Sequence, residues 1–418
     1  MSAASAPLIL FEPAGIEALG PPVALRPVWE LRLGARRLAE RVAAVWPAGA
    51  LHYWTRPALR ALCPPPPAAV FAAQRVLLLA GNQVLLTPEA PRLLAALGAG
   101  ESLRRSDGEG GPVALCLSGR EAEAWLAGLA GDASDWPAPA PVLRESDLGP
   151  LVDYWWELYA LAPQALAADQ AALLAAGDWQ RRESPGGGEF FLAAGAELGP
   201  GAVVDASGGP VFLDRDVKVG ALSVLTGPCY LGPGTRLKPH SQLHAVWAGP
   251  QCRLGGEIEE TQFQGYANKQ HHGFLGHAVV GEWVNLGAGA TNSDLKNNYS
   301  GVRVEQGGRQ LETQQRFLGC CLGDHVKLGI QGRLSTGTVL EPFTNWFGGD
   351  FPLKGLPPFT WGGDGELAEH AIDKALATAA IAMGRRGAQL TPEAERVARA
   401  LFAATAGWRL ERLGRRSA

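Results

Sequence analysis

The sequence lacks several features that would assign a function class directly. No CxxC pair occurs among its six cysteines, so we expect buried thiols in a reducing compartment rather than a disulfide framework. No apolar run reaches the length of about 18 residues that a membrane-spanning helix needs. The first residues carry neither the basic segment nor the apolar stretch of a secretory signal. These absences predict a cytoplasmic protein without a membrane partner.

Charge and glycine-rich motifs narrow the possibilities further. The formal net charge of −4 gives no basis for nucleic-acid binding. Neither GxGxxG nor GxxxxGK[ST] follows an expected strand, so the first half of the chain has no assignable phosphate-binding glycine loop. The 54 glycines and 31 prolines instead punctuate short apolar segments, as turn residues do.

What the sequence does contain is an aliphatic residue at every sixth position. The spacing begins at Leu198 and Val204, and it returns over 280–286 and 322–340. An α-helix repeats every 3.6 residues and a two-faced strand every two, so neither explains this period. A parallel β-helix does, because each hexad supplies one short strand and one turn. The longest unbroken series is Leu213, Val219, Leu225, Leu231, Leu237 and Leu243, and the first five are each followed four positions later by Val217, Ser223, Cys229, Thr235 and Ser241.

The segments outside the hexads predict a mixed architecture. Apolar runs over 9–11, 75–79 and 113–117 read as buried strands, and 33–45 has helical spacing, which favours an α/β sheet domain. A helical block begins near Ser146, and the tail predicts helices over 366–383 and from Pro392, with Thr391 as N-cap. We therefore expect an α/β domain over 1–144, a helical connector over 145–185, a β-helix over 186–345, and a loop with C-terminal helices over 346–418.

The hexads stop twice, between Leu243 and Val280 and between Leu286 and Leu322. Solenoids place insertions at their corners, and protruding loops are where such proteins carry function. Both interruptions flank the coil over 280–290, so we expect them to emerge close together. Function is best sought there.

These two stretches carry a family resemblance. Residues 271–289 run H-x2-F-L-G-x4-G-x3-N-L-G-A-G, and 293–299 read S-D-L-K-N-N-Y. Together with the hexads they resemble the left-handed β-helix acetyltransferase domain of the bacterial bifunctional N-acetylglucosamine-1-phosphate uridylyltransferase/glucosamine-1-phosphate acetyltransferase. The S-D-L-K-N-N-Y segment and RPVWELRLGA (26–35) are similar to a subgroup of predicted sugar nucleotidyltransferases. The resemblance implies a left-handed β-helix, a homotrimer with sites between subunits, an acetyl-CoA or other acyl-CoA donor, and a sugar phosphate or sugar nucleotide as partner.

The resemblance also implies roles for particular residues. His271 falls on the catalytic base, and Asn285 falls on an asparagine that contacts the amino sugar. A histidine can remove a proton near neutral pH, and an amide N–H can donate a hydrogen bond to the oxyanion that develops during acyl transfer. The remaining substrate contacts are Lys238, Phe274, Lys296, Asn298 and Tyr299. From the residues themselves, we expect a cofactor to approach at Gly329, Ile330 and Thr336, and we expect Arg26 and Arg32, in a charged cluster before a helix, to bind phosphate.

Each assignment has a plainer alternative. His271 and His272 also read as a solvated loop pair, Asn285 as part of an asparagine ladder, and 296–298 as an exposed turn. Arg26 and Arg32 also suit pairing with surface glutamates.

The sequence departs from the family in ways that affect function. The family's Gly-x-Gly-Thr-Arg loop and a clear metal-binding Asp are missing, which predicts a degenerate nucleotidyltransferase domain in which Mg²⁺ binding is open. Glu259 lies where the family has a phosphate-binding lysine, so the acceptor need not be glucosamine 1-phosphate. One alternative is a non-catalytic sugar-nucleotide-binding scaffold. A further one is a γ-class carbonic anhydrase holding zinc through His240, His272 and His277. We assign no metal ligands, because the Gly-Ala-Gly and Asn motifs belong to the acyltransferases.

Overall fold

The structure is a computed structural model that describes residues 6–87, 89–104, 111–129, 142–145, 148–363 and 366–414. The chain divides into two compact units. The first comprises Met1–Leu19, Arg26–Leu31 and Arg36–Asp153, and the second comprises Gly20–Leu25, Arg32–Ala35 and Tyr154–Ala418. Two short segments from the beginning of the chain therefore belong to the second unit.

The first unit is built on a six-stranded sheet, which confirms the predicted α/β class. All side chains of the first, fifth and seventh strands are buried, which explains why these strands read as continuous apolar runs. The first strand runs parallel to both of its neighbours. The order across the sheet is β4 (Leu51–Trp54), β1 (Leu8–Phe11), β5 (Val76–Ala80), β7 (Ala114–Leu117), β6 (Glu101–Arg104) and β8 (Val142–Glu145).

The helix expected over 33–45 is shorter than its apolar spacing predicts. Strands β2 (Arg32–Leu33) and β3 (Arg36–Arg37) precede it, and α1 (Leu38–Ala43) begins only after them. Gly34 has a φ of +64°, a left-handed conformation that interrupts a helix and favours glycine. The predicted helical block is realised as α5 (Glu157–Ala160) and α6 (Ala162–Ala176), while Ser146, its expected N-cap, lies outside the described residues.

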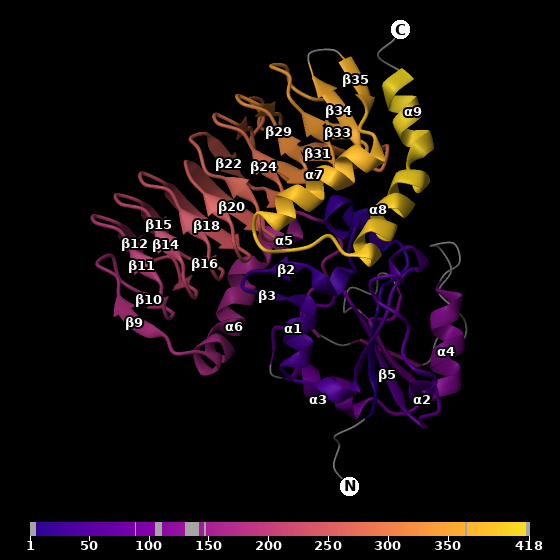
Figure 1. Cartoon of the computed structure of the whole chain (residues 1–418). Coiled ribbons are helices and arrows are strands. Elements are labelled where there is room, and N and C mark those ends of the chain that lie inside the picture. The colour runs from indigo at the N-terminus through magenta and orange to yellow at the C-terminus, as the bar shows by residue number, and fades with distance from the viewer. Residues whose placement is uncertain are drawn as a thin grey trace. The chain divides into compact units, whose positions relative to one another are not determined.

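The second unit is a parallel β-helix, as the hexads predict (Figure 1). Strands one coil apart pair in parallel register, and Val211 pairs with Cys229, 18 positions later. One coil therefore contains three hexads and has three faces. Face one contains β13 (Val211–Leu213) and β16 (Cys229–Leu231), face two contains β14 (Lys218–Val219) and β17 (Arg236–Leu237), and face three contains β15 (Val224–Thr226) and the first half of β18 (Gln242–Ala248).

The interior of the coils is the core that the hexads specify. Every member of the series from Leu213 to Leu243 is at most 4% exposed. Their five small partners, Val217, Ser223, Cys229, Thr235 and Ser241, are all 0% exposed. Each aliphatic side chain buried in this way contributes about 1.5–3 kcal/mol. The small residues are required because three faces converge on a narrow interior.

The first predicted interruption is wrong, because regular coils continue between Leu243 and Val280. Strands β19 (Arg253–Leu254), β20 (Glu257–Phe263), β21 (Asn268–Lys269) and β22 (Phe274–Gly276) all pair with neighbouring coils. Two changes hide them in the sequence. Leu254 pairs with Lys269, only 15 positions later, and Lys269 replaces an aliphatic residue at an inward position where it is 2% exposed.

The second interruption does leave the coil. Residues 293–319, hereafter the insertion loop, follow β25 (Thr291–Asn292) and contain a hairpin of β26 (Arg303–Gln306) and β27 (Arg309–Glu312). An antiparallel bridge between Leu295 and Phe317 closes the base of the loop. The coils then resume at β28 (Cys320–Leu322) and β29 (Lys327–Leu328).

The coils extend further toward the C-terminus than the hexads indicate. β32 (Asn345–Trp346) and β34 (Thr360–Gly363) continue face two, and Trp346 is fully buried in the place of an aliphatic residue. The helix expected over 366–383 begins later, because β35 (Glu366–Glu369) first pairs antiparallel with β34, and α7 (Ile372–Gly384) follows. Thr391 does cap α8 (Pro392–Ala404), as predicted, and α9 (Ala406–Gly414) ends the described chain.

A ladder of stacked rings lines the edge between faces one and two. Ring centroids are 4.2 Å apart for Tyr266 and Trp283, and 4.7 Å apart both for His325 and Phe343 and for Phe343 and Phe359. Phe402 of α8 packs edge-on against Phe359 at 5.1 Å. The C-terminal helices are therefore docked on the solenoid through this ladder (Figure 1).

Two further predictions concern the state of the cysteines and membrane-spanning helices. All six cysteines are free thiols in the part of the chain that the structure describes, and five are buried. Burial raises the pKa of Cys229, Cys252 and Cys320 to about 12, which keeps these thiols protonated. Within the described ranges, the helices are too short or too polar to cross a bilayer.

Candidate functional site

The edge between faces two and three brings several predicted site residues into one line. His271, Ala288 and Ile330 occupy equivalent corner positions of three successive coils. The backbone links them, since Gly289 N donates to His272 O at 3.2 Å and Gln331 N donates to Ala288 O at 2.7 Å. A Cβ built on Gly255 would lie 3.2 Å from Lys238 Cβ and 2.6 Å from Gln270 O, so Lys238 lies two coils from His271 on the same edge. We call this line the site edge.

His271 is exposed at the site edge, and its backbone is anchored from inside the coil. Lys269 Nζ donates to His271 O at 2.6 Å and to Gly255 O at 3.1 Å. Burial lowers the pKa of this lysine to about 8. A buried amine in a hydrophobic interior is costly unless its hydrogen bonds are satisfied, so this contact fixes the corner that presents His271.

Face three, next to His271, carries acidic and aromatic side chains. Phe274 is partly buried and pairs in register with Glu257, and Gly276 pairs with Glu259. A Cβ built on Gly276 would lie within 2.8 Å of both the Phe274 ring and Asp294 Oδ2. The glycine therefore allows this ring to lie flat on the coil beside a carboxylate.

Asn285, the predicted amide donor, lies on face two rather than at the site edge. Its Oδ1 accepts a hydrogen bond from Asn268 Nδ2 at 3.3 Å, and the two residues are paired in register. This is the short asparagine ladder that the sequence left open as an alternative. Asn285 is three residues from Ala288 along the chain, so it approaches the site edge from one side.

Two of the predicted residues of the insertion loop make their hydrogen bonds within the loop itself. Lys296 Nζ donates to Gly301 O at 2.6 Å, and Asn298 Oδ1 accepts from Ser300 N at 3.2 Å. Tyr299 is 64% exposed and has a φ of +57°. Lys296 and Asn298 thus shape a turn, and Tyr299 projects from it.

The predicted cofactor residues divide between two edges. Gly329 and Ile330 lie on the site edge, and Ile330 is 73% exposed. A Cβ on Gly329 would come within 2.9 Å of Phe347 Cα, so this glycine is required by the next coil whether or not a cofactor binds. Thr336 is buried at the opposite end of face three, after β30 (Arg333–Leu334). The structure does not bring Thr336 to the site edge.

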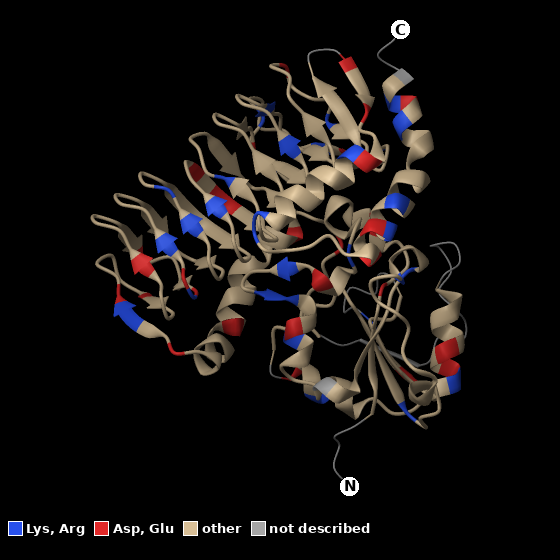
Figure 2. Cartoon of the chain, viewed as in Figure 1, with Lys and Arg blue, Asp and Glu red and all other residues tan. Residues whose placement is uncertain are grey.

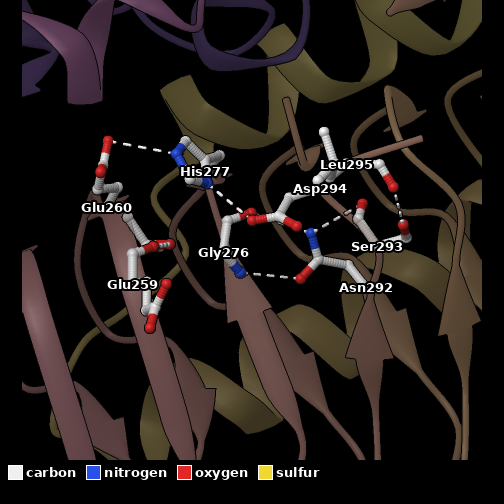
Figure 3. Close-up of polar contacts among 9 residues, drawn as sticks. Glu259, Glu260, Gly276, His277, Asn292, Ser293, Asp294 and Leu295 are labelled. Atoms are coloured by element: carbon white, nitrogen blue, oxygen red, sulfur yellow. Dashed lines mark hydrogen bonds and ion pairs between the residues drawn. The ribbon is translucent and has the colours of Figure 1, made fainter. Parts of the chain in front are cut away.

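A histidine that the sequence did not single out for catalysis lies at the centre of a polar cluster (Figure 3). His277 Nδ1 lies 2.8 Å from Asp294 Oδ2, and its Nε2 lies 3.3 Å from Glu260 Oε2. The ring also stacks on Phe317 and meets Tyr159 edge-on, at centroid distances of 5.3 and 5.8 Å. Burial alone lowers the pKa of His277, but the hydrogen bonds to Asp294 and Glu260 and the charges of both carboxylates raise it to about 9. His277 is therefore an imidazolium at neutral pH and cannot act as a base.

Asn292 completes the attachment of the insertion loop (Figure 3). Its Oδ1 accepts from Gly276 N at 2.9 Å, and its Nδ2 donates to Gly276 O at 3.0 Å. The side chain of Asn292 is 5% exposed. Its amide makes the two hydrogen bonds to Gly276 that the backbone of a paired strand would make. Asn292 and Asp294 thus hold the root of the loop that carries Tyr299. The only available sequence signal was their place in and beside the S-D-L-K-N-N-Y segment.

The two predicted phosphate-binding arginines belong to different units. Arg26 is partly buried in the first unit. Arg32 belongs to the second unit and is 9% exposed. Its backbone N donates to Gln264 Oε1 at 2.7 Å and its O accepts from Gln264 Nε2 at 3.0 Å, while its guanidinium donates to Ala35 O. Arg32 therefore anchors a strand to the solenoid.

The first unit has a hollow where parallel strands β1 and β4 end, the edge at which such sheets bind ligands. The hollow is shallow and is lined in part by Trp54 and Arg60. Glu12, which directly follows β1, is 5% exposed beside it. Its carboxylate accepts hydrogen bonds from Val28 N at 3.1 Å, Arg56 N at 3.0 Å, the Thr55 hydroxyl and the Arg56 guanidinium. A carboxylate thus occupies donors that a phosphate would use.

No three histidine, cysteine or acidic side chains converge on a metal-sized site within the described ranges of one chain. His277, one of the three histidines considered for zinc, has both ring nitrogens directed at carboxylates.

Comparison with known proteins places these features in context. Residues 8–177 match the family model described as sugar nucleotidyl transferase. The bifunctional protein GlmU of Trichormus variabilis is 30% identical over 118 residues, which are 28% of this chain and 24% of that protein. GlmU of a Cyanothece species is 29% identical over 155 residues, 37% of this chain and 29% of that protein.

Two further proteins are similar to this chain at lower sequence identity. A bifunctional sugar-1-phosphate nucleotidylyltransferase/acetyltransferase of Sulfurisphaera tokodaii is 26% identical over 28% of this chain and 29% of that protein. The solved structure of the polysialic acid O-acetyltransferase OatWY aligns over 42% of this chain and 87% of its own, at 10% identity and with a TM-score of 0.15. The chain spans about a quarter of the length of the curated relatives it matches. Over about a quarter to a third of its length the chain is therefore similar to bifunctional GlmU proteins, and its residues 8–177 match the family model described as sugar nucleotidyl transferase.

Proposed function

We propose that this protein is a transferase whose β-helix moves an acyl group from acyl-CoA to the amine of an amino sugar. The observation that carries the proposal is the site edge. It aligns Lys238, His271 and Ile330 on one edge at intervals of two coils, so that the proposed acceptor contact, base and cofactor contact follow one another along the solenoid. Similarity to the bifunctional sugar-1-phosphate nucleotidylyltransferase/acetyltransferase of Sulfurisphaera tokodaii supports the same reaction class.

In this proposal His271 removes the proton of the attacking amine. Acyl-CoA, when bound, supplies a thioester carbonyl open to attack. The exposed side chain of Ile330 offers apolar contact to an extended chain running along the site edge. Lys269 keeps the His271 corner fixed, so the base is positioned before substrate binds. Asn285 approaches from face two and contacts the acceptor.

The acidic residues of face three favour a particular acceptor. Glu257 and Glu259 lie in register with Phe274 and Gly276, beside His271. Carboxylates attract the ammonium form of an amino sugar and repel a phosphate. We therefore propose that the acceptor presents its amine to this face. Any phosphate it carries is directed toward Lys238.

In the first unit we propose a nucleotidyltransferase-like domain that does not turn over nucleotides. Glu12 already accepts hydrogen bonds from the Thr55 hydroxyl and from the backbone and side chain of Arg56, the donors that follow the end of β4. A second anion there would be repelled. The carboxylate is also fully engaged, so the residues present do not fit a Mg²⁺ site, and no step is assigned to the metal.

The test is acyl transfer by the purified full-length protein. Acetyl-CoA is supplied with matched amino sugars, each with and without a 1-phosphate, and free thiol is followed. Thiol release should depend on the amine, and His271→Ala should reduce it by about 10²–10⁴-fold, the range for losing a general base. His272→Ala is the matched control and should retain activity. Unchanged release by His271→Ala would refute the assignment of the base.

We also propose that the solenoid assembles as a homotrimer. Ile330, Phe347 and Trp361 are 73%, 52% and 40% exposed on neighbouring coils. Exposed apolar side chains gathered in this way are typical of contact surfaces. Light scattering after size exclusion should give three times the 44.0 kDa chain mass, and Phe347→Glu should give monomers. A monomeric wild-type protein would contradict this part.

A further inference from the structure

Face two carries a row of basic side chains away from the site edge. Its outward positions are paired strand by strand, from Lys218 to Arg236, then to Arg253, then to Asn268. Neighbouring strands in a sheet lie about 4.8 Å apart, so these side chains are stacked at that spacing. Figure 2 shows the row as successive blue strands β14, β17 and β19, with a blue turn after α7 beside them.

That turn contributes a third guanidinium to the row. Arg386 follows α7, and it is held against face two by two hydrogen bonds. Its Nη2 donates to Asn268 Oδ1 at 2.7 Å, and its Nη1 donates to Gln251 O at 2.5 Å. Arg253 Nη1 donates to the same Gln251 O at 3.2 Å, and to Gly234 O at 2.8 Å. Two guanidinium groups sharing one carbonyl oxygen must lie side by side.

The charges around these groups are predominantly positive. Burial, together with the neighbouring charges of Arg386 and Arg236, lowers the pKa of Arg253 to about 10. Burial also lowers the pKa of Arg386, and Arg385 and Arg236 add to this effect. Lys218, at the end of the row, differs because Glu197 lies 2.5 Å from its Nζ. The carbonyl oxygens that hold Arg253 and Arg386 orient the guanidinium planes but do not neutralise their charge.

We propose that Arg236, Arg253 and Arg386 form a binding site for a phosphoryl-type anion on face two, distinct from the site edge. Guanidinium groups present paired N–H donors that match phosphate oxygens, and here two of them are pre-oriented by backbone contacts. Arg236 is exposed and completes the cluster from the next coil. An anion carrying two or more charges would relieve the repulsion within the cluster. Binding of this kind would also tie the turn after α7 to the solenoid.

The test is binding of inorganic phosphate and pyrophosphate to the full chain, measured by calorimetry and by the shift in melting temperature. We expect saturable binding that is tighter for pyrophosphate and weakens with added salt. Arg236→Gln should weaken it at least about tenfold, the loss expected for one charge-assisted contact. Arg181→Gln is the matched control, since this exposed arginine lies in β9 (Gln180–Glu183), outside the row.

A second variant separates binding from folding. Arg386→Gln should lose pyrophosphate binding, and circular dichroism and the melting temperature without ligand will report any loosening of the α7 turn. Absence of saturable binding at about 10 mM of either anion would overturn the proposal. So would equal weakening in Arg181→Gln, which would indicate unspecific attraction. A change of oligomeric state in Arg236→Gln with unchanged anion binding would assign the cluster to a protein contact instead.

Discussion

His277 and Asp294 are joined by a 2.8 Å contact between Nδ1 and Oδ2, although they lie 17 positions apart in the chain. Glu260 approaches the other ring nitrogen at 3.3 Å. The contact connects a corner of the solenoid with the root of the insertion loop. It is an ion pair at neutral pH, because the two carboxylates raise the pKa of His277 to about 9. The loop that presents Tyr299 is therefore held by a charge that depends on pH.

Replacement of His277 by Gln should destabilise the protein in a pH-dependent way. The folded pKa is raised above the ordinary value of 6.5, so the stabilisation is complete below about 6.5 and is lost as pH rises through 9. We expect His277→Gln to lower the free energy of unfolding by about 1–2 kcal/mol at pH 6.5. The difference from wild type should shrink above pH 9. Urea titrations at both pH values measure it, and a difference that does not vary with pH would contradict the ion pair.

Glu341 is 5% exposed next to the core, and burial raises the pKa of this carboxyl to about 8. Because the folded pKa exceeds the ordinary value of 4.5, wild-type stability should fall as pH rises from 4.5 through 8. Glu341→Gln removes this titration, so the variant should exceed wild type by up to about 4 kcal/mol at pH 9 and match it at pH 4.5. Denaturant titrations test this. Glu312→Gln, on the exposed hairpin, should change stability by less than about 1 kcal/mol at either pH.

Lys269→Met should abolish a second pH dependence and loosen the His271 corner. The folded pKa of Lys269 is about 8, below the ordinary 10.5, so wild-type stability should increase as pH rises from 8 to 10.5. The methionine variant should lack this rise. It also leaves the carbonyls of His271 and Gly255 without their donor, so amide hydrogen exchange over 270–273 should accelerate.

Lys327 provides a matched comparison for Lys269. Its pKa is likewise lowered to about 8 by burial, and its Nζ donates to Trp283 O at 2.6 Å, on another edge. Lys327→Met should remove the same kind of pH dependence but leave exchange over 270–273 unchanged. Faster exchange there in both variants would show that the corner responds to any loss of stability, and the positioning role of Lys269 would fail.

The solenoid was predictable because its packing repeats. One aliphatic and one small residue per hexad recur in the sequence, and Val217 and Ser223 are fully buried as that pattern requires. The prediction failed between Leu243 and Val280 for two physical reasons. Corners of different length shift the spacing, and the interior accepts Lys269 when backbone carbonyls satisfy its amine. The pattern of apolar residues in the sequence reveals neither the change in corner length nor the buried lysine.

The candidate site was only partly predictable. A local motif marked His271 and the S-D-L-K-N-N-Y segment, and the coil geometry then set Lys238 and Ile330 on the same edge as His271. The pairing of His277 with Asp294 and Glu260 depends on where the insertion loop folds back, which residue spacing does not encode. Glu12 was equally hidden, since its role depends on donors from Val28 and Arg56 that converge only in the folded sheet.

The aromatic ladder predicts how the C-terminal helices are attached. Phe359 is fully buried between Phe343 and Phe402, so Phe359→Ala should cost about 3–5 kcal/mol and lower the melting temperature. Phe402→Ala removes only the contribution of α8, so it should leave the solenoid intact while trypsin cleaves faster at Arg385 and Arg386. Phe351→Ala is the control, because this ring is 50% exposed and contacts Arg333 at 5.0 Å; its loss should cost no more than about 1 kcal/mol. If Phe402→Ala left the cleavage rate unchanged, contacts other than the ladder would hold the helices, and the docking role of these stacked rings would be wrong.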